Sequence, residues 1–365
     1  MPDSTGGSDM RERSDYWIST QPPAPSVRAT VVIPTYGAAE TLPRAIESAL
    51  NQSLRDLEVI VIDDASPDHS WDLISDLMQK DNRVRAVRNK TNRGKSVSMN
   101  RALSVARGRW LAVLDADDWY HPDRLEALIS EGERRHVEMV ADNQFLFDAR
   151  ADQMVGTAWP ESQATWKLTF DDFLLGSNAY ENFNLGMLKP VLRTDFMRNV
   201  GLGYEASARQ GEDFFHLLQF YLAGGEAVVC DKPYYYYTQP YGSLSHEWSH
   251  DERVRYDFQN AYEINRRYLR EAEHVLTTRQ RRRLLARNHG LKVLESYFTA
   301  KDAAAEGRWL SVPLVLARHP SSLLHLARRL RNKLFAESEP TTIPRIAARA
   351  RRRDRSTVEN PDAHY

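Results

Sequence analysis

The chain is poor in cysteine and in long apolar runs. Cys230 is the only cysteine among 365 residues, which excludes an intrachain disulfide and makes a reducing compartment the default. No apolar run approaches the ~20 residues that a membrane-spanning helix needs, and the polar residues 1–26 lack the pattern of a secretory signal. We therefore expect a cytoplasmic protein that either stays in solution or lies peripherally on the inner face of the cell membrane.

Net charge is also nearly absent, at −1, but the charges are unevenly distributed. Arginine is concentrated between residues 266 and 355. Such a basic end indicates either a polyanion or an anionic membrane face as partner, or a solvated helix surface followed by a flexible tail. We do not expect nucleic acid as a partner, because no recognised nucleic-acid-binding module accompanies these arginines.

What the chain does contain is a regular alternation of apolar strands and amphipathic helices. Strands are expected at residues 28–36, 57–63, 84–87 and 111–114, separated by helices at 40–50, 70–80 and 97–106. This rhythm predicts parallel strands joined by crossover helices. The expected fold class is α/β, with a mostly parallel, Rossmann-like central sheet, flanking helices and a helical extension at the C-terminal end.

Acidic residues cluster where the predicted strands end. Asp63 and Asp64 follow one strand, and Asp115, Asp117 and Asp118 follow another. Carboxylates at close range raise each other's pKa unless a cation lies between them, and Mg²⁺ or Mn²⁺ takes such oxygen ligands together with phosphate oxygens. Ligands of open α/β sheets bind beyond the carboxyl ends of the strands. The alternative is that the acids only form turns or cap the following helices.

Five short motifs occur along the chain. They are Val31-Val32-Ile33-Pro34-Thr35-Tyr36, Val61-Ile62-Asp63-Asp64-Ala65-Ser66, Asn92-Arg93-Gly94-Lys95-Ser96 with Asn100, Leu114-Asp115-Ala116-Asp117-Asp118 and Gly211-Glu212-Asp213. Each motif alone is weak, but five in this order make a specific pattern. From about Val31 to Tyr237 the chain resembles the family 2 glycosyltransferases of the GT-A fold, particularly bacterial enzymes of exopolysaccharide (succinoglycan-type) biosynthesis.

The resemblance implies a role for each motif. Pro34, Thr35, Tyr36, Asp63 and Asp64 would surround the nucleotide base of a donor, with Glu40 near it. Asn92, Gly94 and Lys95 would line the nucleotide and its diphosphate, and Asp115 with Ala116 would meet the ribose or the water shell of a metal ion. Asp117 would be the metal ligand, and Asp213, with Glu212 beside it, the catalytic base. One departure from the family is Ser98-Met99 before Asn100, where relatives often have alanine and arginine between serine and asparagine.

The implied reaction moves a sugar from a nucleoside diphosphate sugar, by family habit a UDP-sugar, to a hydroxyl of a growing, lipid-linked polysaccharide. It would use Mn²⁺ or Mg²⁺ and invert the anomeric carbon in one displacement. The position of Asp213 at a helix N-terminus would keep it ionised and basic.

Two other functions remain open. A nucleotidyltransferase would usually carry a glycine-rich phosphate loop after the first strand, which is absent here, and Asp117 with Asp213 argues against a non-catalytic sugar-nucleotide-binding scaffold.

Apolar residues at 309–335 form a stripe flanked by arginine and lysine. This pattern fits a helix on an anionic membrane surface, or one that packs its leucines on the main domain. The expected organisation is a disordered leader over residues 1–26, a GT-A catalytic domain over 27–250, a helical region over 251–338 that is the candidate for membrane association, and a basic flexible tail over 339–365. The role of His246 stays open.

Overall fold

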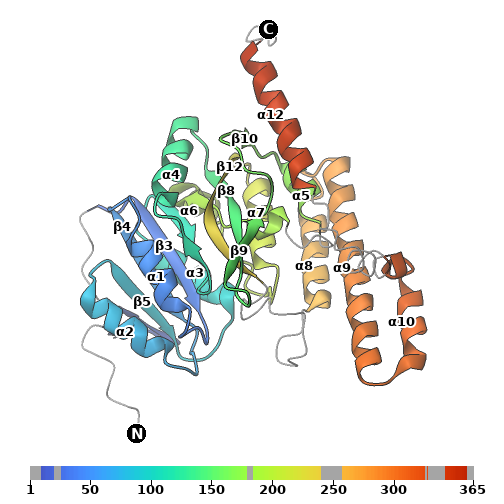
Figure 1. Ribbon diagram of the computed structural model, residues 1–365, viewed down its shortest axis with the longest axis horizontal. Helices are drawn as coiled ribbons and strands as arrows, with labels where there is room; N and C mark the ends of the chain where they lie inside the picture. Colours follow the sequence, from blue (N-terminus) through green and yellow to red (C-terminus); the bar gives the residue numbers. More distant parts are fainter. Residues whose placement is uncertain are drawn as a thin grey trace.

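The computed structural model describes residues 10–19, 26–178, 184–239, 257–324, 327 and 342–359, with side chains described as far as residue 353. His246 lies outside these residues. Within them, one mixed sheet forms the centre of the molecule, with helices on both sides (Figure 1). No helix in this part of the chain is both long enough and apolar enough to cross a membrane.

The sheet has the strand order β1-β2-β5-β4-β3-β6-β11-β8-β12-β10, with β7 paired to β12 and β9 to β8. Strands β5, β4, β3 and β6 run parallel to one another, and β11 is antiparallel to both β6 and β8. The strands are β1 (Met10–Glu12), β2 (Tyr16–Ser19), β3 (Ala29–Thr35), β4 (Leu57–Asp63), β5 (Val84–Asn89), β6 (Trp110–Val113), β7 (Trp119–Tyr120), β8 (Met139–Asp148), β9 (Gln153–Thr157), β10 (Thr165–Lys167), β11 (Val191–Arg193) and β12 (Ala227–Gln239).

The central strands are apolar on both faces because helices cover both. Side chains alternate between the faces along a strand, so Val59 and Val61 of β4 pack in one core layer while Ile60 and Ile62 pack in the other. One layer is closed by α1 (Leu42–Leu50), α2 (Ser70–Lys80) and α4 (Arg124–Arg135). The other is closed by α3 (Lys95–Val105), α6 (Thr194–Val200) and α7 (Glu212–Leu222). The expected α/β class with a mostly parallel central sheet is confirmed.

Residues 150–178 contain β9, β10 and α5 (Phe170–Gly176), and a short 3-10 helix, η1 (Leu185–Met187), lies further along the chain. Helix α5 is a contact surface for the C-terminal helices. These are α8 (Phe258–Glu271), α9 (Thr278–Ala305), η3 (Trp309–Ser311), α10 (Val312–Arg318) and α12 (Ile343–Glu359). Helix α9 packs against α5, α8 and α10, and α12 packs against α5 and β10.

The two ends of the chain differ from the sequence-based expectation. Within the leader, β2 pairs with β1 on one side and with β5 on the other, so residues 10–19 extend the sheet. Within the tail, α12 buries Ile343 and Ile346 in the core. Both segments are held by backbone pairing or apolar contacts that a composition of polar and basic residues does not reveal.

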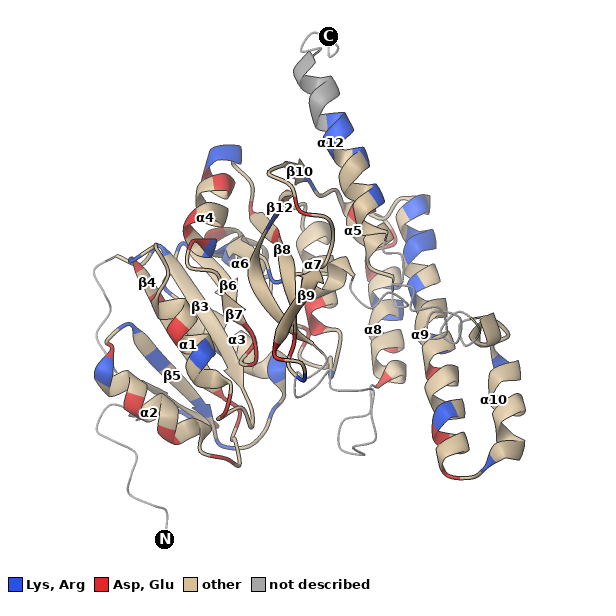
Figure 2. Ribbon diagram, viewed as in Figure 1, with Lys and Arg blue, Asp and Glu red and all other residues tan. Residues whose placement is uncertain are grey.

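The arginines near the C-terminal end have acidic partners within the protein. Figure 2 shows basic residues at the start of α9 and along α12. Arg283 contacts Asp171 at 2.9 Å, and Arg349 forms an ion pair with the fully buried Asp172 of α5. Arg351 of α12 pairs with Asp231 of β12. Part of the basic surface predicted to meet a polyanion therefore fastens α9 and α12 to the sheet domain.

Candidate active site

The candidate site lies at the carboxyl ends of β3, β4 and β6, where the helix N-termini of α3 and α7 also arrive. Strand β4 leads into Asp64, whose backbone N–H donates to Thr35 O at 2.9 Å. The Asp64 carboxylate accepts from the backbone N–H groups of Arg93 and Gly94, both at 2.8 Å. Gly94 has φ +85° and is the N-cap of α3, a conformation that glycine adopts without strain. Asp64 thereby fixes the turn that delivers Lys95.

Two lysines and three carboxylates form the centre of the site. Lys95 Nζ lies 2.8 Å from Asp115 Oδ1, 3.1 Å from Glu212 Oε1 and 3.6 Å from Asp213 Oδ2. Lys189 Nζ lies 2.6 Å from both Asp115 Oδ2 and Asp213 Oδ2. The cluster thus joins residues from α3, from the loop after β6, from the segment before β11 and from the first turn of α7.

The mutual arrangement of these charges decides their protonation. Burial alone would lower the pKa of Lys95, but the three surrounding carboxylates raise it well above its usual value. Burial alone would raise the pKa values of Asp115 and Asp213, but the two ammonium groups lower both. Both lysines, Asp115 and Asp213 therefore carry their charge at neutral pH. Asp213 is ionised as the sequence predicts, although the shift comes from Lys189 and Lys95 rather than from the helix terminus alone.

Asp117 differs from its neighbours because its carboxylate makes no hydrogen bond or ion pair with any residue that the structure describes. Its backbone oxygen is engaged instead, accepting from Arg44 at 3.0 Å and from the Thr238 hydroxyl at 2.6 Å. Burial and the nearby Asp115 carboxylate raise the pKa of Asp117 to about 6. An ionised, unpartnered carboxylate in this position fits a divalent cation, which would relieve its electrostatic cost.

The protein would supply few ligands to such a metal ion. In the described part of the chain, no group of three or more acidic, histidine or cysteine side chains could hold a metal. Mg²⁺ and Mn²⁺ commonly bind through one or two carboxylates and take the remaining ligands from phosphates and water. Asp117 alone, with a diphosphate, satisfies that pattern.

Asp118 has a structural position that the sequence does not distinguish from that of its neighbours. Its carboxylate accepts from the Tyr235 hydroxyl at 2.6 Å and from Thr238 N at 2.8 Å. Tyr235 in turn accepts from the backbone N–H of Asp115 at 3.2 Å. These bonds tie the acidic loop to β12, so that Asp118 holds the loop in which Asp115 and Asp117 face the site.

The remaining predicted residues lie around this centre with less contact to it. Tyr36 is 47% exposed, and Glu40 and Asn92 are exposed as well. The structure describes no hydrogen bond or ion pair between these three side chains and the lysine–carboxylate cluster. Asp63 is fully buried and contacts Arg88 at 3.3 Å, and burial raises its pKa. Pro34 belongs to β3, and Ala116 is buried in the core.

Asn100, the residue that follows the Ser98-Met99 departure, bonds to the backbone of Tyr204. Its side-chain amide donates to Tyr204 O at 2.8 Å and accepts from Tyr204 N at 2.7 Å. Tyr204 stacks on His216 of α7 with ring centroids 4.2 Å apart. Asn100 therefore connects α3 to α7, the helix that carries Asp213.

Sequence reasoning missed Lys189 and Arg44 as members of this region. Lys189 is only 6% exposed, and the signal available was a lysine between apolar residues, directly before Pro190. Arg44 stacks on Trp119 at 3.8 Å from the ring centroid. No local pattern predicts that contact, because the two residues lie in different elements.

Comparison with known proteins identifies the domain. Residues 30–181 match the family model described as Glycosyl transferase family 2. The chain is 34% identical over 219 residues to the succinoglycan biosynthesis protein ExoO of Rhizobium meliloti (strain 1021), covering 59% of this chain and 62% of ExoO. It is 31% identical over 188 residues to ExoU of the same organism, covering 50% of this chain and 54% of ExoU. The matches therefore span less than two thirds of either relative.

Among solved structures, residues 1–349 of S. aureus TarS, crystallised in complex with UDP-GlcNAc, align with a TM-score of 0.52 at 19% identity. The alignment covers 76% of this chain and 73% of that one. Similarity at this level concerns the fold, which is GT-A as the motifs implied. The matched family segment ends before Lys189 and Asp213, so both residues lie in the part of the site beyond it. Residues 30–181 are therefore similar to a glycosyl transferase family 2 domain.

Proposed function

We propose that the chain is an inverting, metal-dependent glycosyltransferase that moves a sugar from a UDP-sugar to a hydroxyl of a lipid-linked saccharide. The observation that carries this proposal is the convergence of Lys95, Lys189, Asp117 and Asp213 at the carboxyl ends of the strands. The family match, the succinoglycan-biosynthesis relatives and the UDP-GlcNAc complex of TarS support a nucleotide-sugar donor.

The two lysines supply positive charge where the departing diphosphate becomes more negative. Lys95 and Lys189 are already oriented by Asp115 and Asp213, so little reorganisation is needed when a diphosphate arrives, and preorganised charge of this kind stabilises a transition state efficiently. Asp117 would hold Mn²⁺ or Mg²⁺, which supplies Lewis-acid stabilisation of the leaving diphosphate.

Asp213 is the proposed general base. Its carboxylate is ionised because Lys189 and Lys95 lower its pKa, and it can accept the proton of an acceptor hydroxyl as that oxygen attacks the anomeric carbon. Attack from the side opposite the diphosphate inverts the configuration in one step. A diphosphate also competes with Asp213 for the lysines, and a weaker Lys189–Asp213 pair makes the carboxylate more basic.

The acceptor side of the proposal includes a membrane surface. Trp309, Leu310 and Leu314 are 68%, 92% and 72% exposed, and Leu324 is 74% exposed. We name Trp309, Leu310, Leu314 and Leu324 the apolar tip. They lie on η3, on α10 and on the helical residues 321–324 that follow, at one end of the molecule (Figure 1). Arg308 and Arg318 flank them. Exposed apolar side chains with neighbouring cations fit the interface of an anionic bilayer.

Purified full-length protein, incubated with a series of sugar nucleotides, tests the function. Release of the nucleoside diphosphate that depends on Mn²⁺ or Mg²⁺, increases with membrane lipid extract and disappears in Asp213→Asn is the expected result. Release of inorganic pyrophosphate would indicate a nucleotidyltransferase instead. Donor binding without any release, under all acceptor conditions, would indicate a sugar-nucleotide-binding scaffold.

A further inference from the structure

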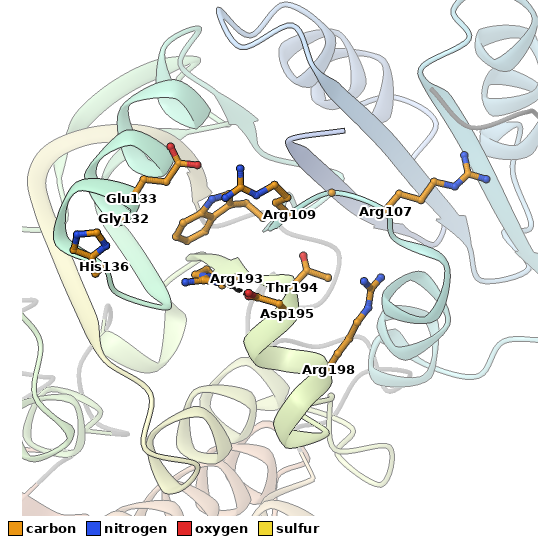
Figure 3. A pocket seen from close by; sticks show the side chains of 11 residues that line it. Arg107, Arg109, Gly132, Glu133, His136, Arg193, Thr194, Asp195 and Arg198 are labelled. Atoms are coloured by element: carbon orange, nitrogen blue, oxygen red, sulfur yellow. Dashed lines mark hydrogen bonds and ion pairs between the residues drawn. The ribbon is translucent and has the colours of Figure 1, made fainter. Parts of the chain in front are cut away.

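A cavity of about 490 Å³ with a charged lining lies beside β6 and β11, at the end of these strands opposite the candidate active site. Its lining comes from the loop between α3 and β6, the C-terminal part of α4, and the junction of β11 with α6 (Figure 3). Strands β6 and β11 are antiparallel, with Arg193 opposite Trp110 and Val191 opposite Ala112. The cavity therefore lies at one end of this strand pair, and Lys189 with Asp115 at the other, about 17 Å away at the rise of a β-strand.

Positive charge exceeds negative charge in the lining. The cavity is lined by Arg107, Arg109, Arg193 and Arg198, against the carboxylates of Glu133 and Asp195. Both carboxylates already have partners, because Glu133 contacts Arg28 at 2.8 Å and Asp195 accepts from Arg193 Nε at 3.0 Å. Among the residues that the structure describes, Arg109 and Arg198 form no ion pair. Four guanidinium groups against two carboxylates leave an excess of positive charge, although Glu133 also acts electrostatically on Arg109, and a bound anion would neutralise that excess.

A buried hydroxyl points to the same conclusion independently. Thr194 is 4% exposed, yet its Oγ1 has no hydrogen-bond partner among the described residues. Figure 3 shows Thr194 projecting into the space between Arg109 and Arg198. Leaving a buried hydroxyl unpaired costs free energy, so a ligand oxygen is a natural partner for it.

We propose that this cavity binds a phosphate monoester group, held by Arg109, Arg193 and Arg198 and accepting a hydrogen bond from the Thr194 hydroxyl. Guanidinium groups match the oxygens of phosphate in bidentate geometry. Donors that approach from three separate elements suit a tetrahedral anion better than a planar carboxylate. The volume lies within the range of small-molecule sites, so the cavity has room for more than the phosphate itself.

This proposal does not depend on the glycosyl-transfer reaction, because none of its residues belongs to the candidate active site. The phosphate group could belong to a soluble metabolite or to a lipid headgroup. Isothermal titration calorimetry with inorganic phosphate and glycerol phosphate tests the first source. Flotation with vesicles of equimolar phosphatidylcholine and phosphatidic acid, against vesicles of phosphatidylcholine alone, tests the second.

Binding to at least one of these probes is expected, and Arg109→Gln and Thr194→Val should each weaken it by about tenfold or more. Thr194→Ser keeps the hydroxyl and should bind like the wild type. Arg134→Gln, on the exposed surface of α4 and paired with Glu131, is the matched control and should also leave binding unchanged. Because Thr194→Val removes an unpaired buried hydroxyl, it should not lower the melting temperature.

Three results would overturn the proposal. The first is the absence of binding by every probe. The second is binding that Arg109→Gln and Thr194→Val leave unchanged. The third is binding that disappears in Lys95→Met but persists in Arg109→Gln, which would assign the phosphate to the candidate active site.

Discussion

Lys189 Nζ lies 2.6 Å from Asp213 Oδ2, although the two residues come from separate segments on either side of β11 and α6. The same ammonium group lies 2.6 Å from Asp115 Oδ2, so a single lysine links the loop after β6 to the first turn of α7. This contact lowers the pKa of the proposed base and closes the candidate site in a part of the chain that lies beyond the matched family segment, residues 30–181.

Replacing the proposed base should abolish turnover while leaving the donor site in place. For Asp213→Asn we expect kcat to fall by roughly 10²–10⁴-fold, the usual contribution of general-base catalysis, with donor affinity changed far less. Initial rates of nucleoside diphosphate release and a donor-binding titration measure the two effects. Asp72→Asn, in the first turn of α2, is the control for altering an acid at a helix N-terminus. Wild-type kcat in Asp213→Asn would rule out the assignment.

Removing the Lys189 ammonium should shift the pH dependence of the reaction. In the wild type, the positive charges of Lys189 and Lys95 outweigh the effect of burial and lower the pKa of Asp213. The base therefore stays ionised even when the pH falls to the ordinary pKa of an aspartate. In Lys189→Met one of the two positive charges that offset the burial of Asp213 is lost, so the pKa of Asp213 rises. The acid limb of the profile of kcat against pH should then move to higher pH.

The same variant should also lower stability. Lys189 is 6% exposed, and breaking a buried ion pair by removing one partner costs about 3–5 kcal/mol of unfolding free energy. Urea unfolding at neutral pH measures this change. Lys167→Met removes a half-exposed lysine paired with Glu226 and should change neither property. An unmoved acid limb in Lys189→Met would mean that the lysine does not control the base.

Mn²⁺ should stabilise the wild type through Asp117. A cation that binds only the folded state raises the melting temperature by mass action, and Asp117 is the carboxylate of the acidic loop for which the described residues provide no partner. In Asp117→Asn, thermal unfolding should no longer respond to Mn²⁺. Without metal, this variant should be as stable as the wild type or more so, because burial and Asp115 disfavour the charge at position 117. Asp123→Asn, at the N-cap of α4, serves as the control; equal Mn²⁺ responses in all three proteins would place the metal elsewhere.

The apolar tip should carry membrane association. Trp309→Ser combined with Leu310→Ser should release the protein from vesicles that contain phosphatidylglycerol, since each exposed apolar side chain contributes through the area it buries. Sedimentation with the vesicles measures binding. Leu285→Ser, a half-exposed leucine on α9, is the matched control. A truncation after Glu306 is a poorer test, because it also removes the packed helix α12. Unchanged sedimentation of the double variant would leave the tip without this role.

Helix α12 should stabilise the sheet domain. Ile346 is 2% exposed within the main core, so Ile346→Ala should lower the free energy of unfolding by about 2–5 kcal/mol. Chemical unfolding followed by circular dichroism measures it. Ala348→Ser, on the same helix, is the control. If both variants unfold at the same urea concentration, α12 contributes no packing energy and behaves as the flexible tail that its composition suggests.

The alternation of apolar strands with amphipathic helices was enough to determine the fold class, because side-chain period and parallel crossover connections leave few alternatives. Helix α2 lies at the predicted residues 70–80. The acids at the strand ends were also readable, since carboxyl ends of parallel strands share one edge of the sheet. The motifs likewise predict Lys95 and Asp213 as site residues, without any information on the contact between them.

Only the tertiary structure could separate the roles of adjacent acids. Asp117 and Asp118 are neighbours in one motif, but the second is bonded to Tyr235 and Thr238 of a strand more than a hundred residues away. The carboxylate of the first has no bonding partner among the described residues. The sheet hairpin at residues 10–19 and the docking of α12 depend in the same way on distant partners. The local sequence determines the hydrophobic periodicity and the type of each residue. Which strands pair, which side chains are buried and which charges find a partner depend on the distant segments that the fold brings into contact.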